Sequence, residues 1–599
     1  MSEQAASVSW EVVQKDIASQ LRKFGSKDLG LSRGRLVLAL VGLVSAGILF
    51  AGGGTWFAFI AAASAVGFIV LLSWHESVFR CLVLNRRKMA FMERSAKRVR
   101  TGVDSDGPEG VELVPADHPA AWDLNIFGKG SLFATICLAK TRGGQKTLSS
   151  WLLEPDSAAE IRRRAESVQE LRPELLLRME RVSLSGDLPR GADLEACQRW
   201  GESQLPCIEI WWIIAGGLVA LLSWSSLVGW LMFGWLLSPF LFGVLLTGIL
   251  YVACLSRLQI ILGDISRHAE TLRLLAGTIR VMGARTWKSD MLRHCLEDTG
   301  TNAESSLQEL GGHVGRWNAR LNQLFAPVAF LIFWDFLHAR WIGAWHARHG
   351  VAIRGWALAV SRFEALDSLA HQAYLFPDAI FPTILDDGEA SISGEGLAHP
   401  LINPERCVRN DVNVTTPIRC LLISGSNMSG KSTYMRTVGV NVVLALAGGA
   451  VHARRLAVSP MRVVATLQIQ DSLAEGLSRF GAELARLRIV VNLSHQSPPL
   501  LFLIDEIFSG TNSGDRLAGA EALIEDLLRH GAIGMVTTHD LALTRIAENL
   551  RDRGANAHFI DRIEDGRMVF DYQLRAGIVC GSNARGLMRA IGIGVSENR

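Results

Sequence analysis

The sequence predicts a mixed fold, in which an all-α region carrying two transmembrane helical hairpins precedes an α/β domain. The 599 residues are 49% hydrophobic and 20% charged, which is too apolar for an ordinary soluble enzyme and too charged for a purely membrane-embedded bundle. Two long runs, 36–74 and 210–256, contain no charged residue or histidine. Beyond Pro377 the sequence changes to short β-branched runs and glycine turns. This composition excludes disordered, collagen-like and coiled-coil classes.

The two charge-free runs have the length and the interruptions expected of helical hairpins. Gly52-Gly53-Gly54-Thr55 divides the first run, and a break near 234–239 divides the second. Each half is about long enough to cross a bilayer as a helix. Buried soluble helices are the alternative, but a soluble helix turns one face to water and these uncharged runs provide no such face. The sequence therefore predicts four membrane spans.

The residues beside the hairpins predict how the chain is oriented in the membrane. Neither hairpin tip carries a charge, whereas basic residues flank the first hairpin. They are Lys15, Arg22, Lys23, Lys27, Arg33, Arg35, Arg80, Arg86, Arg87 and Lys88. By the positive-inside rule, both termini and the α/β domain are expected in the cytoplasm, in a multi-pass protein of the inner or plasma membrane. Nine scattered cysteines without a C-x-x-C pair are typical of buried thiols in a reducing compartment.

Six segments follow from these boundaries. They are a cytoplasmic N-terminal segment (1–35), hairpin 1 (36–74), a helical region (75–209), hairpin 2 (210–256), a second helical region (257–389) and the α/β domain (390–599). Residues 325–345 are apolar enough to resemble a fifth span. Because Asp335, His338 and Arg340 lie inside this segment, a packed soluble helix is the favoured interpretation.

The C-terminal domain contains a phosphate-binding pattern in the required context. A short apolar strand at 421–424 runs into a segment that fits G-x-x-x-x-G-K-[ST], and a helical pattern follows over 433–446. Backbone N–H groups of such a loop surround phosphates, the lysine neutralises phosphate oxygens, and the serine hydroxyl ligates Mg²⁺. The expected binding residues are Gly425, Ser426, Asn427, Met428, Ser429, Gly430, Lys431, Ser432 and Thr433. The pattern predicts a P-loop NTPase that uses ATP and Mg²⁺.

Two further apolar strands end in candidate catalytic residues. The strand at 500–504 leads into Asp505 and Glu506, and the strand at 533–537 leads to His539. Asp505 is placed to hold the Mg²⁺ and Glu506 to act as general base on the attacking water. Because the carboxyl ends of parallel strands share one edge of the sheet, His539 is expected to point into the same crevice and sense the γ-phosphate. Lys431, Glu506 and His539 are the predicted catalytic residues.

At this point the motifs resemble those of one family. The segment 425–436 is similar to the P-loop GPNMGGKSTYMR of the MutS mismatch-repair ATPases, and 471–480 looks like that family's serine-containing signature loop. Residues 505–512 look like its DEIGRGT motif, and 537–539 like its switch histidine. Upstream, the Trp151-Leu-Leu-Glu-Pro155 stretch resembles the start of the MutS core helical domain.

The resemblance implies an ABC/MutS-type ATPase that works as a homodimer, moves helical arms and acts on DNA. It also implies that Ser478 reaches the γ-phosphate bound by the second subunit. The chain departs from the family at its N-terminus, where a membrane hairpin replaces the mismatch-reading domain. Phe91-Met92-Glu93 fits the family's Phe-x-Glu wedge by chance. No nuclease-like domain follows the ATPase, which is expected to end in a hairpin around 564–566 and a final helix.

Two other functional classes stay open. An ABC-type exporter half would also join an ATPase to membrane spans, but no LSGGQ-like element precedes the strand at 500–504. No ionisable residue lies inside the spans to mark a polar substrate path. The third class is a nucleotide-gated scaffold that binds another protein. The net charge of +3 gives no global signal for a polyanionic partner.

Overall fold

The computed structural model describes residues 10–104, 106–184, 192–300, 302–323, 325–426, 428–467, 479–508, 512–564 and 567–578. The chain forms two compact units. The first combines Met1–Arg98 with Pro173–Asp187, and the second combines Val99–Arg172 with Leu188–Arg599. The predicted helical region 75–209 is therefore shared between the two units.

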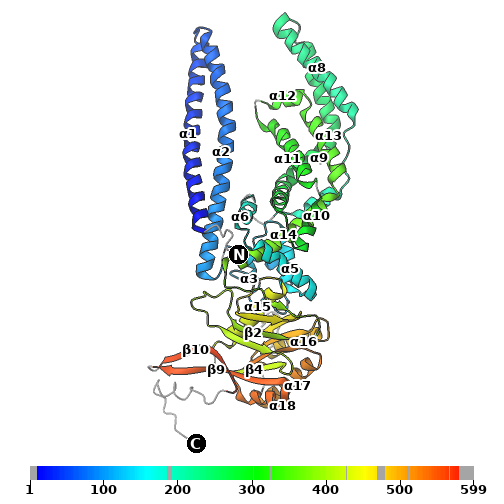
Figure 1. The fold of residues 1–599 in the computed structure, drawn as a ribbon. Coiled ribbons are helices and arrows are strands. Elements are labelled where there is room, and N and C mark those ends of the chain that lie inside the picture. Colours follow the sequence, from blue (N-terminus) through cyan, green and yellow to red (C-terminus); the bar gives the residue numbers. More distant parts are fainter. Residues whose placement is uncertain are drawn as a thin grey trace. The chain divides into compact units, whose positions relative to one another are not determined.

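The first unit is built on a long helical hairpin. Helices α1 (Trp10–Phe50) and α2 (Trp56–Thr101) run antiparallel (Figure 1). Small residues let them approach closely, since a Cβ added at Gly42 would lie 3.4 Å from the Ser64 Cβ atom. The hairpin exposes large apolar side chains, among them Phe50 at its tip. The short helix α6 (Leu175–Leu184) completes the unit, and Arg87 of α2 donates a hydrogen bond to the Ser183 carbonyl.

The helical part of the second unit has one buried central helix. Nearly every residue of α14 (Ala352–Leu375) from Val360 onward is buried. Glu364 accepts hydrogen bonds from the Lys140 and Thr141 backbone N–H groups, at 3.0 and 3.1 Å, so α14 joins segments far apart in the sequence. The surrounding helices are α3 (Leu132–Ile136), α4 (Arg142–Leu153), α5 (Ala158–Leu171), α7 (Leu194–Glu202), α10 (Asp290–Thr299) and α11 (Ala303–Trp317).

A second apolar hairpin extends from this region. It consists of α8 (Ile210–Phe233) and α9 (Ser238–Gly283). By length and composition, α1, α2, α8 and α9 are the four helices among the described residues that could cross a membrane. The 325–345 segment is not one of them. It is divided into α12 (Ala326–Leu331) and α13 (Trp334–His349), and Asp335 accepts a hydrogen bond from the Trp317 indole at 2.7 Å.

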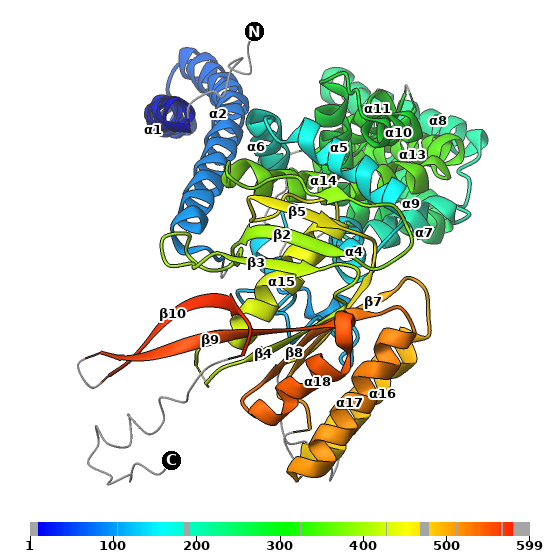
Figure 2. The same cartoon turned by 60° about the horizontal axis from the view of Figure 1, so that its bottom comes forward.

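The α/β domain contains a six-stranded sheet in the order β10-β9-β4-β8-β7-β6 (Figure 2). Strands β9, β4, β8, β7 and β6 are parallel, and β10 pairs antiparallel with β9. Their bounds are β4 (Cys420–Ser424), β6 (Arg462–Thr466), β7 (Leu500–Asp505), β8 (Ile533–Thr538), β9 (Gly554–Glu564) and β10 (Arg567–Ala576). The strands β4, β7 and β8 are buried almost throughout, as expected for parallel strands covered on both faces. The three strands predicted from the sequence are all present.

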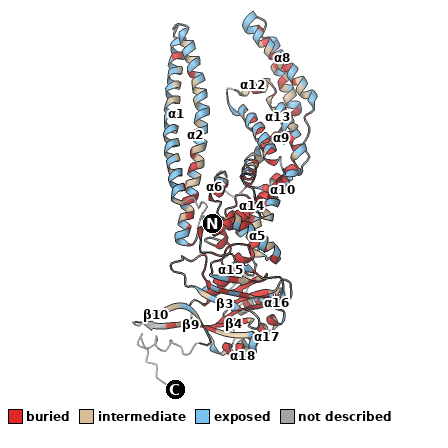
Figure 3. Ribbon diagram, in the orientation of Figure 1, coloured by how far each residue is buried: buried red, intermediate tan, exposed pale blue. Residues whose placement is uncertain are grey.

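Helices cover the large sheet, and a smaller sheet packs against one of them, α15. The helices are α15 (Lys431–Leu446), α16 (Arg479–Ser494), α17 (Ser513–Arg529) and α18 (Arg545–Asn549). The smaller sheet has the order β1-β5-β2-β3, from β1 (Thr383–Ile384), β2 (Ile392–Leu397), β3 (Asn410–Val414) and β5 (Arg455–Val458). Figure 3 shows buried residues concentrated in the α/β domain and around α14, whereas α1, α2 and α8 are largely exposed. A mostly helical N-terminal region thus precedes an α/β domain, as predicted.

Candidate functional site

The loop between β4 and α15 is shaped by two glycines. Gly425 has φ 154° and Gly430 has φ 104°, a range that side-chain-bearing residues rarely adopt. Gly430 directly precedes α15 and caps its N-terminus. The first N–H groups of a helix have no partner within the helix and carry partial positive charge. The loop therefore presents backbone donors where an anion can bind. Of the predicted loop residues, Asn427 lies outside the described part of the chain.

Lys431 folds back over this loop. Its Nζ atom donates hydrogen bonds to the Gly425 and Ser426 carbonyls, both at 2.8 Å. Burial lowers the pKa of Lys431, and the nearby carboxylates of Asp505, Glu506 and Asp561 oppose this shift. The lysine is thus a nearly buried cation at the loop, where phosphate oxygens can replace the two carbonyls as acceptors.

Asp505 joins the loop to two strands of the sheet. The Ser432 hydroxyl donates to the Asp505 Oδ2 atom at 2.5 Å, and the Thr537 hydroxyl of β8 donates to Oδ1. A hydroxyl and a carboxylate in contact are the oxygen ligands that Mg²⁺ prefers. The donor set formed by Ser432 and Asp505 therefore fits Mg²⁺, as the sequence predicted for these two residues.

Glu506 and His539 lie together just beyond the strands. Glu506 has φ 53°, a left-handed conformation that is uncommon for glutamate and often marks functional sites. Its backbone N–H donates to the Thr537 carbonyl at 3.2 Å. The His539 Nδ1 atom lies 3.3 Å from the Glu506 Oε1 atom. Two of the three predicted catalytic residues are thus in direct contact.

The loop after β4, Lys431 and the two carboxylates Asp505 and Glu506 line one cleft of about 660 Å³. Its inner wall contains Ser426, Gly430, Lys431, Ser432, Asp505 and Glu506. The outer wall was not predicted from the sequence. It consists of Tyr572 on β10 and the segment that contains Ile402, Arg406, Cys407, Val408 and Asn410.

Tyr572 lies directly over the loop between β4 and α15. A Cβ added at Gly430 would meet the Tyr572 ring at 3.0 Å. The Asn410 side chain holds this part of β10, donating to the Tyr572 carbonyl at 2.9 Å and accepting from the Leu574 N–H at 2.8 Å. No sequence motif marks Tyr572. The ring reaches the cleft only because β10 folds against β3.

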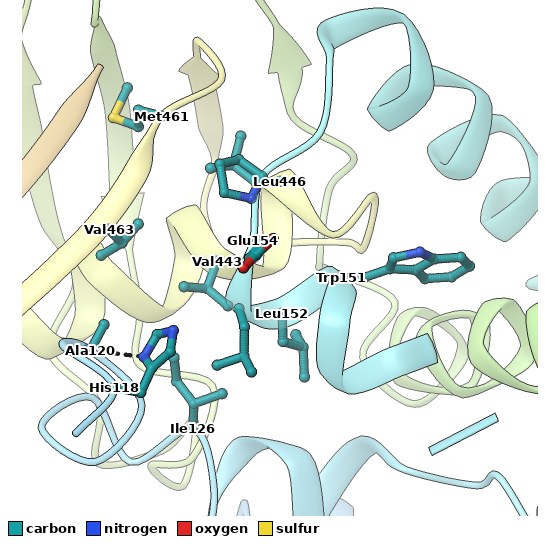
Figure 4. Close-up of a pocket in the computed structure, with 12 residues that line it drawn as sticks. His118, Ala120, Ile126, Trp151, Leu152, Glu154, Val443, Leu446, Met461 and Val463 are labelled. Carbon is teal, nitrogen blue, oxygen red and sulfur yellow. Dashed lines mark hydrogen bonds between the residues drawn. The ribbon is translucent and has the colours of Figure 1, made fainter. Parts of the chain in front are cut away.

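The Trp151-Leu-Leu-Glu-Pro155 stretch contacts the far end of α15. Figure 4 shows Trp151, Leu152 and Glu154 together with Val443 and Leu446 of α15, around a small gap in the packing. His118 lies at the same junction, and its Nδ1 atom accepts hydrogen bonds from the Ala120 and Ala121 N–H groups at 3.3 and 3.2 Å. Burial lowers the pKa of His118, which favours the neutral ring that can accept them. The helix that starts at the cleft therefore ends against the helical region.

Several predicted elements lie outside the described residues. They include Ser478 and most of the 471–480 signature segment, residues 509–511 of the 505–512 motif, and the predicted turn and final helix near the C-terminus. The other predicted site residues lie on or beside the loop that follows β4, or just beyond the ends of β7 and β8.

Comparison with known proteins agrees with this geometry. Residues 421–596 match the model of MutS domain V. The chain is 35% identical over 243 residues to DNA mismatch repair protein MutS 2 of Halobacterium salinarum, which is 40% of this chain and 27% of that protein. It is 28% identical over 245 residues to DNA mismatch repair protein MutS of Thermotoga petrophila, covering 39% and 30% of the two chains.

These matches identify the C-terminal α/β domain as a domain of the MutS type. Through this domain the chain is similar to MutS-family proteins, as its motifs predicted. The matched region spans less than a third of each of these two relatives.

Proposed function

We propose that this protein is a membrane-anchored, MutS-type ATPase that binds ATP in the cleft at the carboxyl ends of β4, β7 and β8 and hydrolyses it. The observation that carries the proposal is the 2.5 Å contact between Ser432 and Asp505. This contact joins the loop between β4 and α15 to the end of β7, which Glu506 directly follows. The binding groups and the candidate base therefore share one cleft.

The residues divide the chemistry between them. The loop N–H groups and Lys431 bind the phosphates, which replace the Gly425 and Ser426 carbonyls at the lysine Nζ atom. Ser432 and Asp505 would hold Mg²⁺, which when bound would neutralise phosphate charge. Glu506 orients the attacking water and accepts its proton, and His539 restrains the Glu506 carboxylate from the other side. The Tyr572 ring offers the nucleobase a flat surface on which to stack.

The experiment is ATP binding by the full-length protein in lipid nanodiscs. Lys431→Ala removes the cation from the loop, and we expect ATP affinity to fall at least about a hundredfold, since a buried charge–phosphate contact is lost. Lys146→Ala is the matched control, because Lys146 makes an ion pair with Glu195 on the helical region. Unchanged ATP affinity in Lys431→Ala would reject the assigned cleft.

In this proposal, the four apolar helices α1, α2, α8 and α9 anchor the protein in the membrane. By the positive-inside rule, the flanking basic residues support a cytoplasmic location for both termini and the α/β domain. Reporter fusions at Gly53 and at residue 599 test this topology, and we expect opposite signals. Both reporters on the same side of the membrane would reject the four-span arrangement.

The proposed partner of the helical region is DNA. Two relatives carry the name DNA mismatch repair protein, and this part of the proposal rests on that likeness. The protein acts as a homodimer in which Ser478 of each subunit completes the other's ATP site. In this proposal the protein holds DNA through its phosphate backbone.

A further inference from the structure

Three elements of the α/β domain converge on one acid, Asp123. Asp123 lies between the short helix at Val111–Leu113 and α3, in a segment that precedes the helical core. Its side chain is 8% exposed. The Oδ1 atom accepts a hydrogen bond from the Leu467 N–H at 3.1 Å, and Oδ2 accepts one from Arg486 Nη1 at 3.0 Å. The Asp123 carbonyl accepts a third from Arg436 Nε at 2.9 Å.

Each partner belongs to a different element of the α/β domain, and one of these elements, α15, begins at the cleft. Arg436 lies on α15, the helix that begins with Lys431. Leu467 directly follows β6, whose Ala465 N–H also bonds the Pro119 carbonyl at 2.9 Å. Arg486 lies on α16. Residues 119–123 therefore extend the edge of the sheet and tie it to two of its helices.

Helix α16 continues the connection to the catalytic carboxylate. Glu483 lies one turn before Arg486 and is 1% exposed. Its Oε1 atom accepts a hydrogen bond from the Phe508 N–H. The Phe508 carbonyl accepts a second one from Arg516 Nε of α17, at 3.0 Å. Phe508 is two residues beyond Glu506, so α16 holds the turn that sets where the Glu506 carboxylate lies.

We propose that Asp123 is a positioning residue for Glu506. By binding Arg486 it fixes α16, and α16 fixes the Phe508 turn through Glu483. The inference rests on the proposed ATPase function and deepens it. Because residues 119–123 lead into α3 and α4, hydrolysis then depends on how firmly the helical region is seated on the edge of the sheet.

The physical basis is the charge on a nearly buried carboxylate. Asp123 is largely buried, whereas the Arg486 side chain is 45% exposed, so loss of the acid frees Arg486 to turn towards water. Asp123→Asn keeps an acceptor for the Leu467 N–H and removes only the charge. The contacts of Lys431 with the loop are untouched by this change. We therefore expect the variant to bind ATP normally and hydrolyse it slowly.

The test compares kcat, ATP affinity and hydrogen exchange in full-length protein. For Asp123→Asn we expect kcat to fall about tenfold with ATP affinity unchanged, since small displacements of a catalytic group are costly. Arg486→Gln should give the same loss, and the double variant should lose no more than either single one. Exchange of the backbone amides over 500–508 should quicken in all three variants.

Glu364→Gln is the matched control. It also neutralises a buried carboxylate that accepts backbone N–H groups, and these belong to Lys140 and Thr141 of the helical region. It should leave kcat and exchange over 500–508 unchanged. Wild-type kcat and exchange in Asp123→Asn would overturn the inference, as would equal losses in Asp123→Asn and Glu364→Gln.

The two proposals can fail separately. If the wild-type protein hydrolyses no ATP, the proposed function fails, and the exchange measurement alone still decides whether Asp123 controls the Phe508 turn. Quickened exchange in Asp123→Asn but not in Glu364→Gln supports that link. Equal exchange in the two variants overturns it.

Discussion

Helices α8 and α15 are both rich in apolar residues, yet they bury opposite kinds of side chain. In α15 the large residues are buried, including Tyr434, Met435 and Leu444. In α8 the buried residues are mostly small, namely Gly216, Val219, Ser223, Ser226 and Gly229, while Leu218 and Leu221 are exposed.

This contrast shows that hydropathy alone does not decide whether protein or lipid covers an apolar helix. An apolar helix avoids water, but the material that covers it can be protein or lipid. Close approach through small residues with large apolar residues facing outward is the pattern of membrane helices. A Cβ added at Gly243 of α9 would come within 2.2 Å of the Ser223 hydroxyl, so α8 and α9 are packed backbone against backbone. In α15 the large residues fill a protein core instead.

The largest effect is expected at the end of β7. Glu506→Ala should lower kcat about a thousandfold, because it removes the general base while leaving the phosphate-binding groups in place. ATP affinity should stay within a few-fold of wild type, in contrast to Lys431→Ala. The measurements are steady-state hydrolysis and equilibrium binding. Glu548→Ala, on the exposed surface of α18, is the control, and a parallel loss of ATP binding in Glu506→Ala would contradict the assigned role.

A lysine placed in each of the two compared helices should have different consequences. Val440→Lys buries an unpaired charge in α15 and should destabilise the α/β domain by about 3–5 kcal/mol. Leu221→Lys should leave the unfolding of that domain unchanged and weaken membrane insertion by about 3 kcal/mol. Chemical unfolding and alkaline extraction of membranes measure the two effects.

The two alanine variants at these positions keep the apolar character and serve as controls. If Leu221→Lys destabilised the α/β domain as much as Val440→Lys, the outer face of α8 would have to be covered by protein. The contrast between the two helices would then be lost.

A smaller effect should appear when two inactive variants are mixed. Lys431→Ala and Ser478→Ala lie in different halves of the proposed composite site. After subunit exchange about half of the dimers are mixed and each has one intact site, so about a quarter of the wild-type hydrolysis rate should return. No recovery, with exchange shown by labelled subunits, would remove Ser478 from the mechanism.

The smallest effect is expected in the difference between the affinities for matched and mismatched DNA. Binding should weaken steeply with salt, since phosphate contacts release counterions. Affinities for matched and singly mismatched duplexes should differ by less than about threefold, because backbone contacts carry no information about mismatches. A fluorescence titration over a salt series measures both. A strong preference for the mismatch at physiological salt would reveal a reading element in the helical region.

The sequence by itself determined the features that depend on neighbouring residues. A strand, a glycine-containing loop and a helix follow one another within 421–446, and the two carboxylates follow their strand directly. The apolar helices were predictable for the same reason, since length and lack of charge are local properties. The resemblance of the C-terminal domain to MutS proteins followed from four such motifs in order.

Only the tertiary structure brought in the residues that act from a distance. Tyr572 reaches the cleft because β10 folds back beside β3, and Asp123 meets Leu467 and Arg486 across more than three hundred residues of chain. Neither residue lies in a periodic pattern or a motif. Their roles arise from contacts between distant segments, which local patterns of polarity and turn residues do not encode.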